Sequence, residues 1–366
     1  ARLLDPTRML TLVKLLIGIA VAQGFLGLVQ FGTAQTGDML FQVPGGHTES
    51  ATGSYANRNH LAGLMEMTLP LVLALFFYAL HHAESPQRAK GWLRQKAAYL
   101  TSRSGGTTVI YGIIAVFLII SVLFTRSRTG ITLSLLGVVI AAMMFARRPA
   151  EGSKLGPVLA VVTLAAVGAL AIGLAPVVER FSVAAVGEDT RWQLFDLTIE
   201  GGKAYLPVGT GPGTFPWAFP AWQPADLGHR FVNRAHNDYL EWFFDVGLLA
   251  VVIIAIALAV YVRQWKRLHN GRDASPIHLV QAAAGISLLL LAIHELVDYN
   301  LYTPMNQLGF GLLAAVFLKA ERRGAAESHK KPRRRTPDLA VPTPAVERTQ
   351  PGVRGQVANP FRESSD

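Results

Sequence analysis

FVNRAHNDYLEWFFD (residues 231–245) runs directly into VGLLAVVIIAIALAVYV (residues 246–262). The second half of this stretch is apolar throughout and approaches the roughly 20 residues that cross a bilayer as a helix. The first half combines a histidine, an arginine and several acidic and aromatic residues. Polar groups beside a membrane segment are costly unless they line a wet cavity or a site. The stretch therefore predicts a membrane helix with a polar site at its end.

Composition also indicates an integral membrane protein. The chain has 366 residues, of which 51% are hydrophobic and 16% charged, whereas soluble domains contain about 25% charged residues. Its net charge is +10, but the basic residues lie in short blocks between apolar runs, as in cytoplasmic connections rather than a nucleic-acid surface. We therefore expect membrane lipids, and no nucleic acid, among its partners. Without cysteine, the chain has neither a disulfide framework nor a thiolate site.

Apolar runs close to spanning length recur eight times, which predicts an all-α fold, a polytopic transmembrane helical bundle. The expected spans lie at about 10–31, 61–80, 107–125, 129–146, 155–175, 246–262, 277–297 and 304–318. Lysines and arginines concentrate in the connections 81–106, 147–154 and 263–276. By the positive-inside rule, these connections and both termini are cytoplasmic.

The longest connection, 176–245, then falls on the opposite side, and it is expected to hold short interfacial helices. We expect residues 1–318 to form the membrane domain, which includes this loop. Residues 319–366 are rich in Arg, Lys, Pro, Ser and Thr and predict a disordered basic cytoplasmic tail. The tail either contacts anionic lipid headgroups or only sets the topology as a solvated segment.

Arginines occur at the outer ends of several predicted spans. Arg58 stands between Asn57 and Asn59 just before the second span; either asparagine could simply cap the helix, or Arg58 could contact a polar ligand. Arg126 and Arg128 separate the third and fourth spans on the outer side, against the positive-inside preference. They either reach lipid phosphates or turn inward, where the planar guanidinium suits a phosphate.

Two further motifs lie in the long loop. The apolar pattern of residues 190–200 predicts a short interfacial helix, and Arg191 near its start could bind a phosphate or pair with Glu188 or Asp189. GTGPGTF, at residues 209–215, is glycine-rich but lacks the Lys-Ser/Thr of a phosphate-binding P-loop. It predicts a tight turn rather than a nucleotide site.

His236 is the candidate general base, because an imidazole titrates near neutral pH. It stands between Arg234 and Asn237 and is followed by Asp238 and Tyr239. A nearby carboxylate could fix its tautomer. A single histidine without a second ligand at metal-binding spacing predicts no metal site, and the alternative is a purely structural hydrogen bond.

A second polar cluster ends the seventh span. His294 and Asp298 are four residues apart, so on a helix they share a face. They could satisfy each other structurally, or they could support the site around His236.

In this order, the motifs resemble the O-antigen ligase and polymerase superfamily of bacterial envelope glycosyltransferases. The resemblance covers roughly residues 50–318. The matching pieces are Asn57-Arg58-Asn59, Ser127–Gly130, Arg191 with Gly209–Phe215, Ala235–Leu240, and His294–Asn300 with Pro304 and Asn306. Members of the superfamily usually have more spans than the eight counted here.

The resemblance implies a multi-pass protein of the bacterial inner (cytoplasmic) membrane, with its active site at the periplasmic face. It implies transfer of a glycan from undecaprenyl pyrophosphate to a hydroxyl acceptor, such as lipid A core, another glycan or a protein, without metal or cofactor. By position, Arg128 and Arg191 resemble the arginines that contact pyrophosphate, and His236 resembles the histidine that activates the acceptor. We expect substrate-binding roles also for Arg126, Arg58 and Asn237, and supporting roles for Asp238, Tyr239, His294 and Asp298.

Several activities remain open at this point. An O-antigen ligase, an O-antigen or exopolysaccharide polymerase and a protein O-oligosaccharyltransferase share this chemistry. A covalent route through Asp238 or Glu241 is also open. A flippase or transporter for lipid-linked glycans is the alternative from another class, but it should carry ionisable residues at mid-bilayer within broken helices. The gathering of polar groups at one face favours interfacial chemistry.

Overall fold

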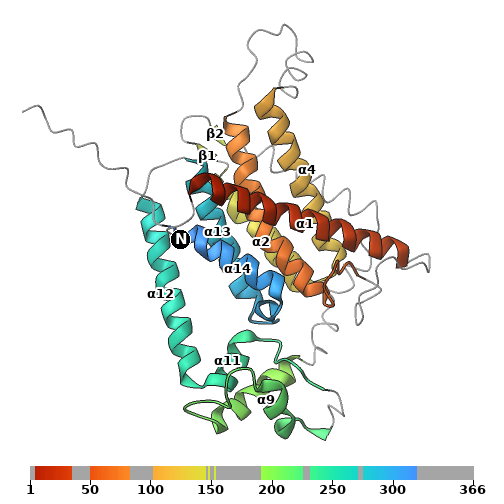
Figure 1. Cartoon of the computed structure of the whole chain (residues 1–366), viewed down its shortest axis with the longest axis vertical. Coiled ribbons are helices and arrows are strands. Elements are labelled where there is room, and N and C mark those ends of the chain that lie inside the picture. The colour runs from red at the N-terminus through yellow and green to blue at the C-terminus, as the bar shows by residue number, and fades with distance from the viewer. Residues whose placement is uncertain are drawn as a thin grey trace, which may run out of the picture. The chain divides into compact units, whose positions relative to one another are not determined.

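The computed structural model describes residues 5–34, 50–82, 102–145, 147–148, 152–153, 191–225, 231–270 and 275–319. The predicted span at 155–175 and nearly all of the predicted tail lie outside these residues. The described helices are α1 (Pro6–Ala34), α2 (Arg58–His81), α4 (Arg103–Phe124), α5 (Arg128–Phe145), α9 (Arg191–Ala204), α10 (Phe215–Ala218), α11 (Asp238–Val246), α12 (Leu248–Asn270), α13 (Pro276–His294) and α14 (Pro304–Phe317), with the 3₁₀ segments η1 (Phe219–Trp222) and η3 (Asn300–Tyr302). Figure 1 shows this helical architecture, which confirms the predicted fold class. The strands β1 (Arg147–Arg148) and β2 (Gly152–Ser153) form one short antiparallel pair.

Six described helices, α1, α2, α4, α5, α12 and α13, are long and apolar enough to cross a membrane. They coincide with six of the predicted spans, so the protein is a multi-pass membrane protein. The predicted span at 304–318 corresponds to α14, which has only 14 residues. At 1.5 Å per residue α14 rises about 21 Å, less than the roughly 30 Å of a hydrocarbon core.

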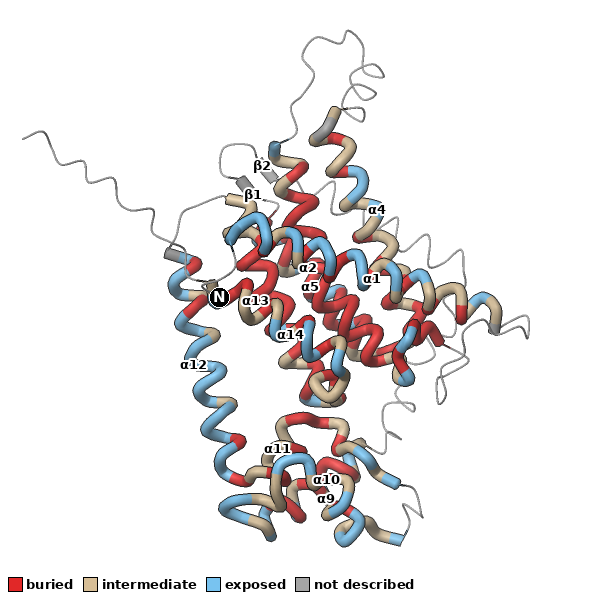
Figure 2. Tube along the Cα trace, viewed as in Figure 1, coloured by how far each residue is buried: buried red, intermediate tan, exposed pale blue. Residues whose placement is uncertain are grey.

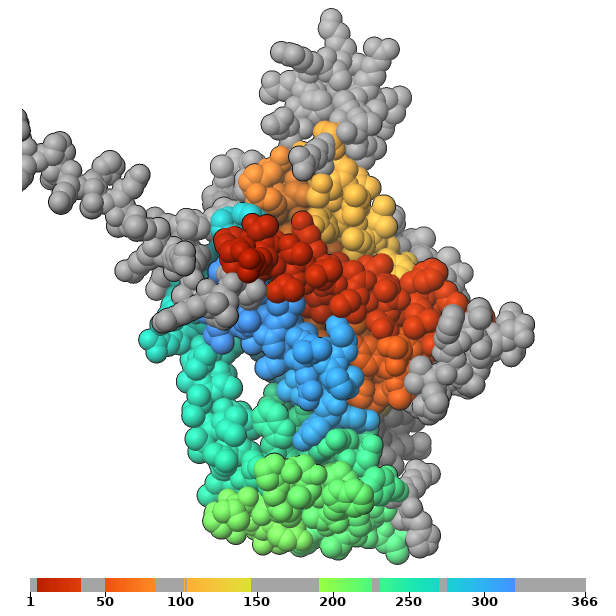
Figure 3. Space-filling model, in the orientation of Figure 1, coloured from red at the N-terminus to blue at the C-terminus, as the bar shows by residue number. Residues whose placement is uncertain are grey.

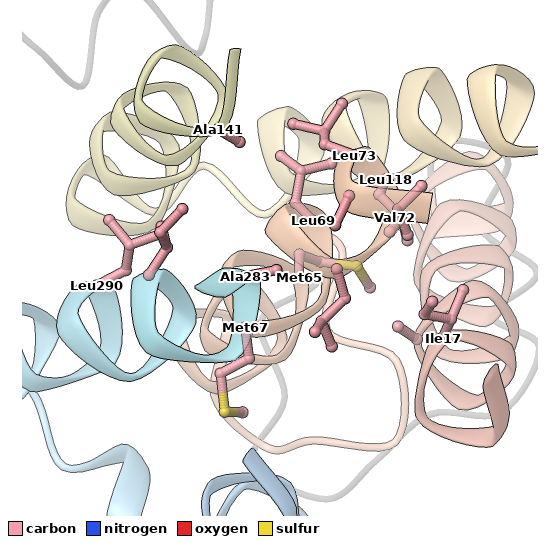
Figure 4. Close-up of a cluster of buried hydrophobic side chains, with 14 of the residues drawn as sticks. Ile17, Met65, Met67, Leu69, Val72, Leu73, Leu118, Ala141, Ala283 and Leu290 are labelled. Atoms are coloured by element: carbon pink, nitrogen blue, oxygen red, sulfur yellow. The ribbon is translucent and has the colours of Figure 1, made fainter. Parts of the chain in front are cut away.

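Helix α2 forms the centre of the bundle. Of the residues in its most apolar 18-residue stretch, 94% are buried. The helix packs against α4, α5 and α13. Figure 2 shows α2 as an almost continuous buried segment. The close-up in Figure 4 shows Met65, Leu69 and Leu73 of α2 among side chains from the neighbouring helices, such as Leu118 of α4 and Leu290 of α13.

The first turn of α2 is set by a side-chain cap. The Oδ1 atom of Asn57 accepts a hydrogen bond from the backbone N–H of Asn59 at 2.9 Å. The predicted asparagine cap is therefore confirmed, and it leaves Arg58 as the first residue of the helix. Helix α5 packs closely against this end of α2. A Cβ atom on Gly130 would lie 2.3 Å from Cβ of Ala62, so the close approach of the two helices requires a glycine at position 130.

Helix α12 makes few contacts with the bundle. Of the residues in its most apolar 18-residue stretch, only 11% are buried. Figure 2 shows exposed residues along most of the length of α12. It meets the bundle through Tyr261, whose hydroxyl donates to the carbonyl of Gly285 at 3.0 Å, and through ring contacts with Phe317. In the space-filling view, open space separates α12 from α14 over part of its length (Figure 3). Exposed apolar side chains of this kind suit a helix surrounded by lipid.

The segments α9, α10, η1 and α11 gather at the end of the molecule where α12 begins (Figure 1). They enclose a separate small apolar core of Leu194, Phe215, Phe219, Ala235 and Phe244. The glycine-rich turn docks on the end of α11, where the backbone N–H of Gly211 donates to the carbonyl of Asp245 at 2.8 Å and that of Gly213 donates to its carboxylate at 2.7 Å. The predicted helix at 190–200 and the predicted tight turn are both confirmed.

Candidate active site

The carboxylate of Asp298 lies at the meeting point of four segments of the chain. It is fully buried. Its Oδ2 atom accepts a hydrogen bond from the side-chain amide of Asn59 at the start of α2. The same oxygen lies 3.7 Å from the Nη2 atom of Arg191 at the start of α9. Residues far apart in the sequence are therefore joined through one buried acid.

The second oxygen of Asp298 faces two imidazoles. Its Oδ1 atom accepts the backbone N–H of Tyr299 at 2.9 Å. It lies 3.8 Å from Nε2 of His60 and 4.0 Å from Nδ1 of His236. A carboxylate in this position can interact with a proton on Nδ1 of His236 and so favour the tautomer whose Nε2 atom is free to act as a base.

The charge state of Asp298 depends on its neighbours. Burial alone would raise the pKa of its carboxyl group. Arg191 and His294, followed by His236 and His60, oppose this effect and bring the pKa below its ordinary value. The site thus keeps a buried carboxylate ionised beside the candidate base.

His236 is held in a strained backbone conformation. Its φ angle is +54°, a left-handed value that non-glycine residues rarely adopt and that often marks functional sites. Asn237 fixes the next position: its Oδ1 atom caps α11 at the N–H of Leu240, and its Nδ2 atom donates to the carbonyl of Leu296 at 2.8 Å. The side chain of His236 remains 27% exposed, so a substrate can reach it.

A pocket of about 430 Å³ brings together the predicted arginines. Arg58, Arg126, Arg128 and Arg191 all line it, beside apolar side chains from α5, α9 and the end of α13. His236 is not among the lining residues, but Arg191 belongs to the pocket and also faces Asp298. Arg191 therefore connects the arginine pocket to the carboxylate that faces His236.

The arginines come from helix starts and a strained turn. Arg58, Arg128 and Arg191 are the first residues of α2, α5 and α9, and helix N-termini favour anions through their free N–H groups and dipoles. Arg126 has a φ of +55°, and its guanidinium lies 5.5 Å from the ring centre of Phe31. Nη1 of Arg191 donates to the carbonyl of Val297 at 2.6 Å. The predicted partners of Arg191 at 188 and 189 lie outside the described residues.

The segments around His236 also hold three buried acids, Asp238, Glu241 and Glu295. The carboxylate of Glu241 binds Nη1 of Arg234 at 2.7 Å and accepts the backbone N–H of Ala235 at 2.9 Å. Asp238 is also buried, and burial raises its pKa to about 7. Burial and the charge of Asp238 raise the pKa of Glu295 as well. Since Asp238 and Glu241 are buried, direct attack by either on a bulky sugar is disfavoured.

A direct pairing of His294 with Asp298, one of the two alternatives that the sequence left open, is not found. Nδ1 of His294 instead lies 3.0 Å from Oε2 of Glu66, and both side chains are fully buried. The reason is local: α13 ends at His294, so the four-residue spacing no longer places both side chains on one helical face. Tyr239 lies near the same end of α13, where its hydroxyl donates to the carbonyl of Ala292 at 2.7 Å.

Sequence reasoning missed the roles of three α2 residues in this network. Asn59 and His60 face Asp298, and Glu66 contacts His294. Glu66 did carry a signal, because an acid inside an apolar span is rare and usually has a partner. Within the part of the chain that the structure describes, no group of three His, Asp or Glu residues is placed to hold a metal ion.

Comparisons of the chain with curated proteins and with solved structures gave no match. A family model described as O-antigen ligase matches residues 113–255. The matched range contains Arg126, Arg128, Arg191 and His236, whereas Glu66 and Asp298 lie outside it. Residues 113–255 are therefore similar to the O-antigen ligase family.

Proposed function

We propose that the protein transfers a glycan from undecaprenyl pyrophosphate to a hydroxyl acceptor at the periplasmic face of the bacterial inner membrane. The observation that carries this proposal is the link from the four-arginine pocket, through Arg191 and Asp298, to His236. The family match at residues 113–255 supports a glycosyltransferase of the ligase or polymerase type.

The arginine pocket suits the leaving group of such a reaction. When the bond between the sugar C1 and the diphosphate oxygen breaks, the diphosphate takes the electron pair. Guanidinium groups bind phosphate oxygens through paired N–H donors, and they stabilise the charge that develops in the transition state. The helix starts at Arg58, Arg128 and Arg191 add favourable dipoles. The apolar wall of the pocket suits the lipid next to the diphosphate.

His236 suits the acceptor side of the reaction. The acceptor oxygen forms the new bond to C1 and loses its proton to the imidazole, while Asp298 stabilises the imidazolium that forms. A positioned general base of this kind contributes on the order of 10²–10⁴-fold to the rate. Direct attack on the face opposite the diphosphate inverts the anomeric centre.

The test uses membranes that contain the protein, a lipid-linked glycan and an acceptor. His236→Ala should abolish transfer, whereas Asn233→Ala, at a nearby exposed position, should transfer at the normal rate. Arg128→Ala and Arg191→Ala should raise the KM for the donor. Near-normal transfer by His236→Ala would refute its role as the base, and unchanged donor dependence in both arginine variants would refute the phosphate-binding role.

Metal independence and acceptor class need separate measurements. Transfer should survive EDTA; loss that Mg²⁺ restores would contradict a metal-free reaction. A deletion strain should accumulate free lipid-linked polymer if the protein is a ligase and single capped units if it is a polymerase. Loss of glycan from a secreted protein, with normal surface polysaccharide, would indicate a protein O-oligosaccharyltransferase.

A further inference from the structure

The backbone that follows His236 is fixed to the residues after α13 by two hydrogen bonds. Nδ2 of Asn237 donates to the carbonyl of Leu296 at 2.8 Å. The backbone N–H of Asp238 donates to the carbonyl of Glu295 at 3.0 Å. These bonds hold the chain on the C-terminal side of His236.

Two ring contacts continue this docking in the other direction along the chain. The ring centre of His236 lies 4.8 Å from that of Tyr299, in an edge-to-face arrangement. The guanidinium of Arg234 lies 3.7 Å from the ring centre of Tyr302. Successive residues around His236 thus meet the connection between α13 and α14 in reverse order, as two segments that lie antiparallel do.

Glu241 reaches back from α11 to the backbone on the N-terminal side of His236. Its Oε2 atom accepts the backbone N–H of Ala235 at 2.9 Å, and its Oε1 atom accepts Nη1 of Arg234 at 2.7 Å. Both partners can only donate, so both carboxylate oxygens serve as acceptors. The side chain of Glu241 is fully buried, which shields these two hydrogen bonds from competing water.

The backbone of His236 requires such anchors. Its φ of +54° is a left-handed value that is unfavourable for a residue with a Cβ atom. Conformations of this kind persist where the surrounding structure over-determines them. Asn237 and Asp238 hold one side of His236 and Glu241 holds the other, so the flanking peptides cannot rotate to relieve the strain. The imidazole is thereby kept with Nδ1 4.0 Å from Oδ1 of Asp298.

We propose that Glu241 is a positioning residue, which keeps the imidazole of His236 facing Asp298 by holding the backbone that precedes it. The role of His236 as the base rests on the proposed function. A purely stabilising role of Glu241 would leave the geometry of His236 unchanged in any variant that still folds.

The first experiment compares kcat and the KM for the donor in the wild type and in Glu241→Gln. Glutamine has one acceptor oxygen where glutamate has two, so it loses the contact with either Ala235 or Arg234 at nearly unchanged size. A misplacement of about 1 Å can cost about 10²-fold in rate, so kcat should fall by roughly tenfold to 10²-fold. The KM should change little, because neither Glu241 nor Arg234 lines the arginine pocket.

The matched control is Glu200→Gln, at an exposed position of α9. It makes the same chemical change away from His236 and should keep the wild-type kcat. A normal kcat in folded Glu241→Gln, with or without a raised KM, would overturn the proposal. If Glu241→Gln does not fold, Arg234→Met tests the same anchor by removing the guanidinium. It should lower kcat at least several-fold, and a normal kcat would then overturn the proposal.

Chemical modification of His236 tests its positioning without measuring transfer. Diethyl pyrocarbonate acylates accessible imidazoles, and mass spectrometry of the digested protein follows each histidine separately. In Glu241→Gln, His236 should react several-fold faster than in the wild type, because its backbone can relax out of the strained conformation. His60, buried beside the same carboxylate, should stay as protected as in the wild type. The exposed His269 should react at the same rate in both proteins.

The modification rates also separate this proposal from the proposed function. An unchanged rate at His236 would refute the positioning role. Faster modification of His60 together with His236 would show a general loosening of the site and would refute it as well. Faster modification of His236 alone, with a wild type that transfers no glycan, would retain the positioning role and reject the proposed function instead.

Discussion

At the scale of single residues, Asp298 is the point on which the candidate site depends. Asp298→Asn keeps the shape and removes the charge, so Nδ1 of His236 loses its acidic neighbour and the imidazolium loses its stabilisation. We expect kcat to fall by roughly 10²-fold or more, within the range of general-base contributions. Steady-state kinetics on lipid-linked donor would check this. A normal kcat, with only the KM for the donor raised, would show that Asp298 supports donor binding by Arg191 and does not support His236 as the base.

The raised pKa of Asp238 predicts a pH dependence of stability. Burial raises it from 3.8 to about 7, so the folded protein binds this proton more tightly than the unfolded chain does. The free energy of unfolding should then fall as pH rises through this interval. Asp238→Asn should remove much of that decline in Tm, measured in detergent between pH 4 and about 7. The exposed Asp196→Asn on α9 should keep the wild-type slope; an unchanged slope in Asp238→Asn would contradict the assignment.

The sequence indicated several of these residues but not their partners. His236, Arg128 and Arg191 stood out because charged groups beside apolar runs are costly. The contact between His294 and Glu66 joins positions 228 residues apart, and no local pattern connects them. Spacing instead suggested Asp298 as the partner of His294, which would hold only if α13 continued beyond His294. Tertiary packing, rather than periodicity, decides which buried groups meet.

At the scale of elements, the spans were predictable because the bilayer imposes a length and an apolar composition on each helix. Helix starts were also readable, since Asn57 caps α2 as its residue type suggests. The convergence of the starts of α2, α5 and α9 on one pocket was not predictable, because it depends on close contacts such as that of Gly130 with Ala62.

The glycine-rich turn allows a paired test at this scale. Gly209 and Gly213 both have positive φ angles, +76° and +74°. A Cβ atom on Gly209 would lie 2.4 Å from the carbonyl of Asp245, whereas one on Gly213 would meet nothing within 4 Å. Gly213→Ala should therefore lower the free energy of unfolding by only about 1–2 kcal/mol, the cost of a left-handed alanine.

Gly209→Ala should be more destabilising, because it also forces the turn away from the end of α11. Since α11 begins two residues after His236, transfer activity should fall together with the stability. Thermal unfolding in detergent, combined with transfer rates, measures both effects. Equal losses of stability in the two variants would show that the turn does not depend on its contact with Asp245.

At the scale of the whole molecule, the site combines two kinds of surface. The arginine pocket offers positive charge beside apolar side chains, and His236 lies on the other side of Asp298. A substrate with a lipid, a diphosphate and a sugar needs these properties in this order. In the proposed function, this arrangement would place a polar reaction beside the bilayer.

The proposed orientation of the whole molecule can be tested because the chain contains no cysteine. A single cysteine can therefore be introduced without background labelling. Asp196 on α9 and Lys266 near the end of α12 are both exposed, and the proposed topology puts them on opposite sides of the membrane. A membrane-impermeant maleimide, admitted to the periplasm of intact cells, should label Asp196→Cys and should label Lys266→Cys only after lysis. Labelling of Lys266→Cys in intact cells, with protection of Asp196→Cys, would invert the topology and place His236 on the cytoplasmic side. That result would exclude a periplasmic reaction even if the arginine pocket still bound the diphosphate.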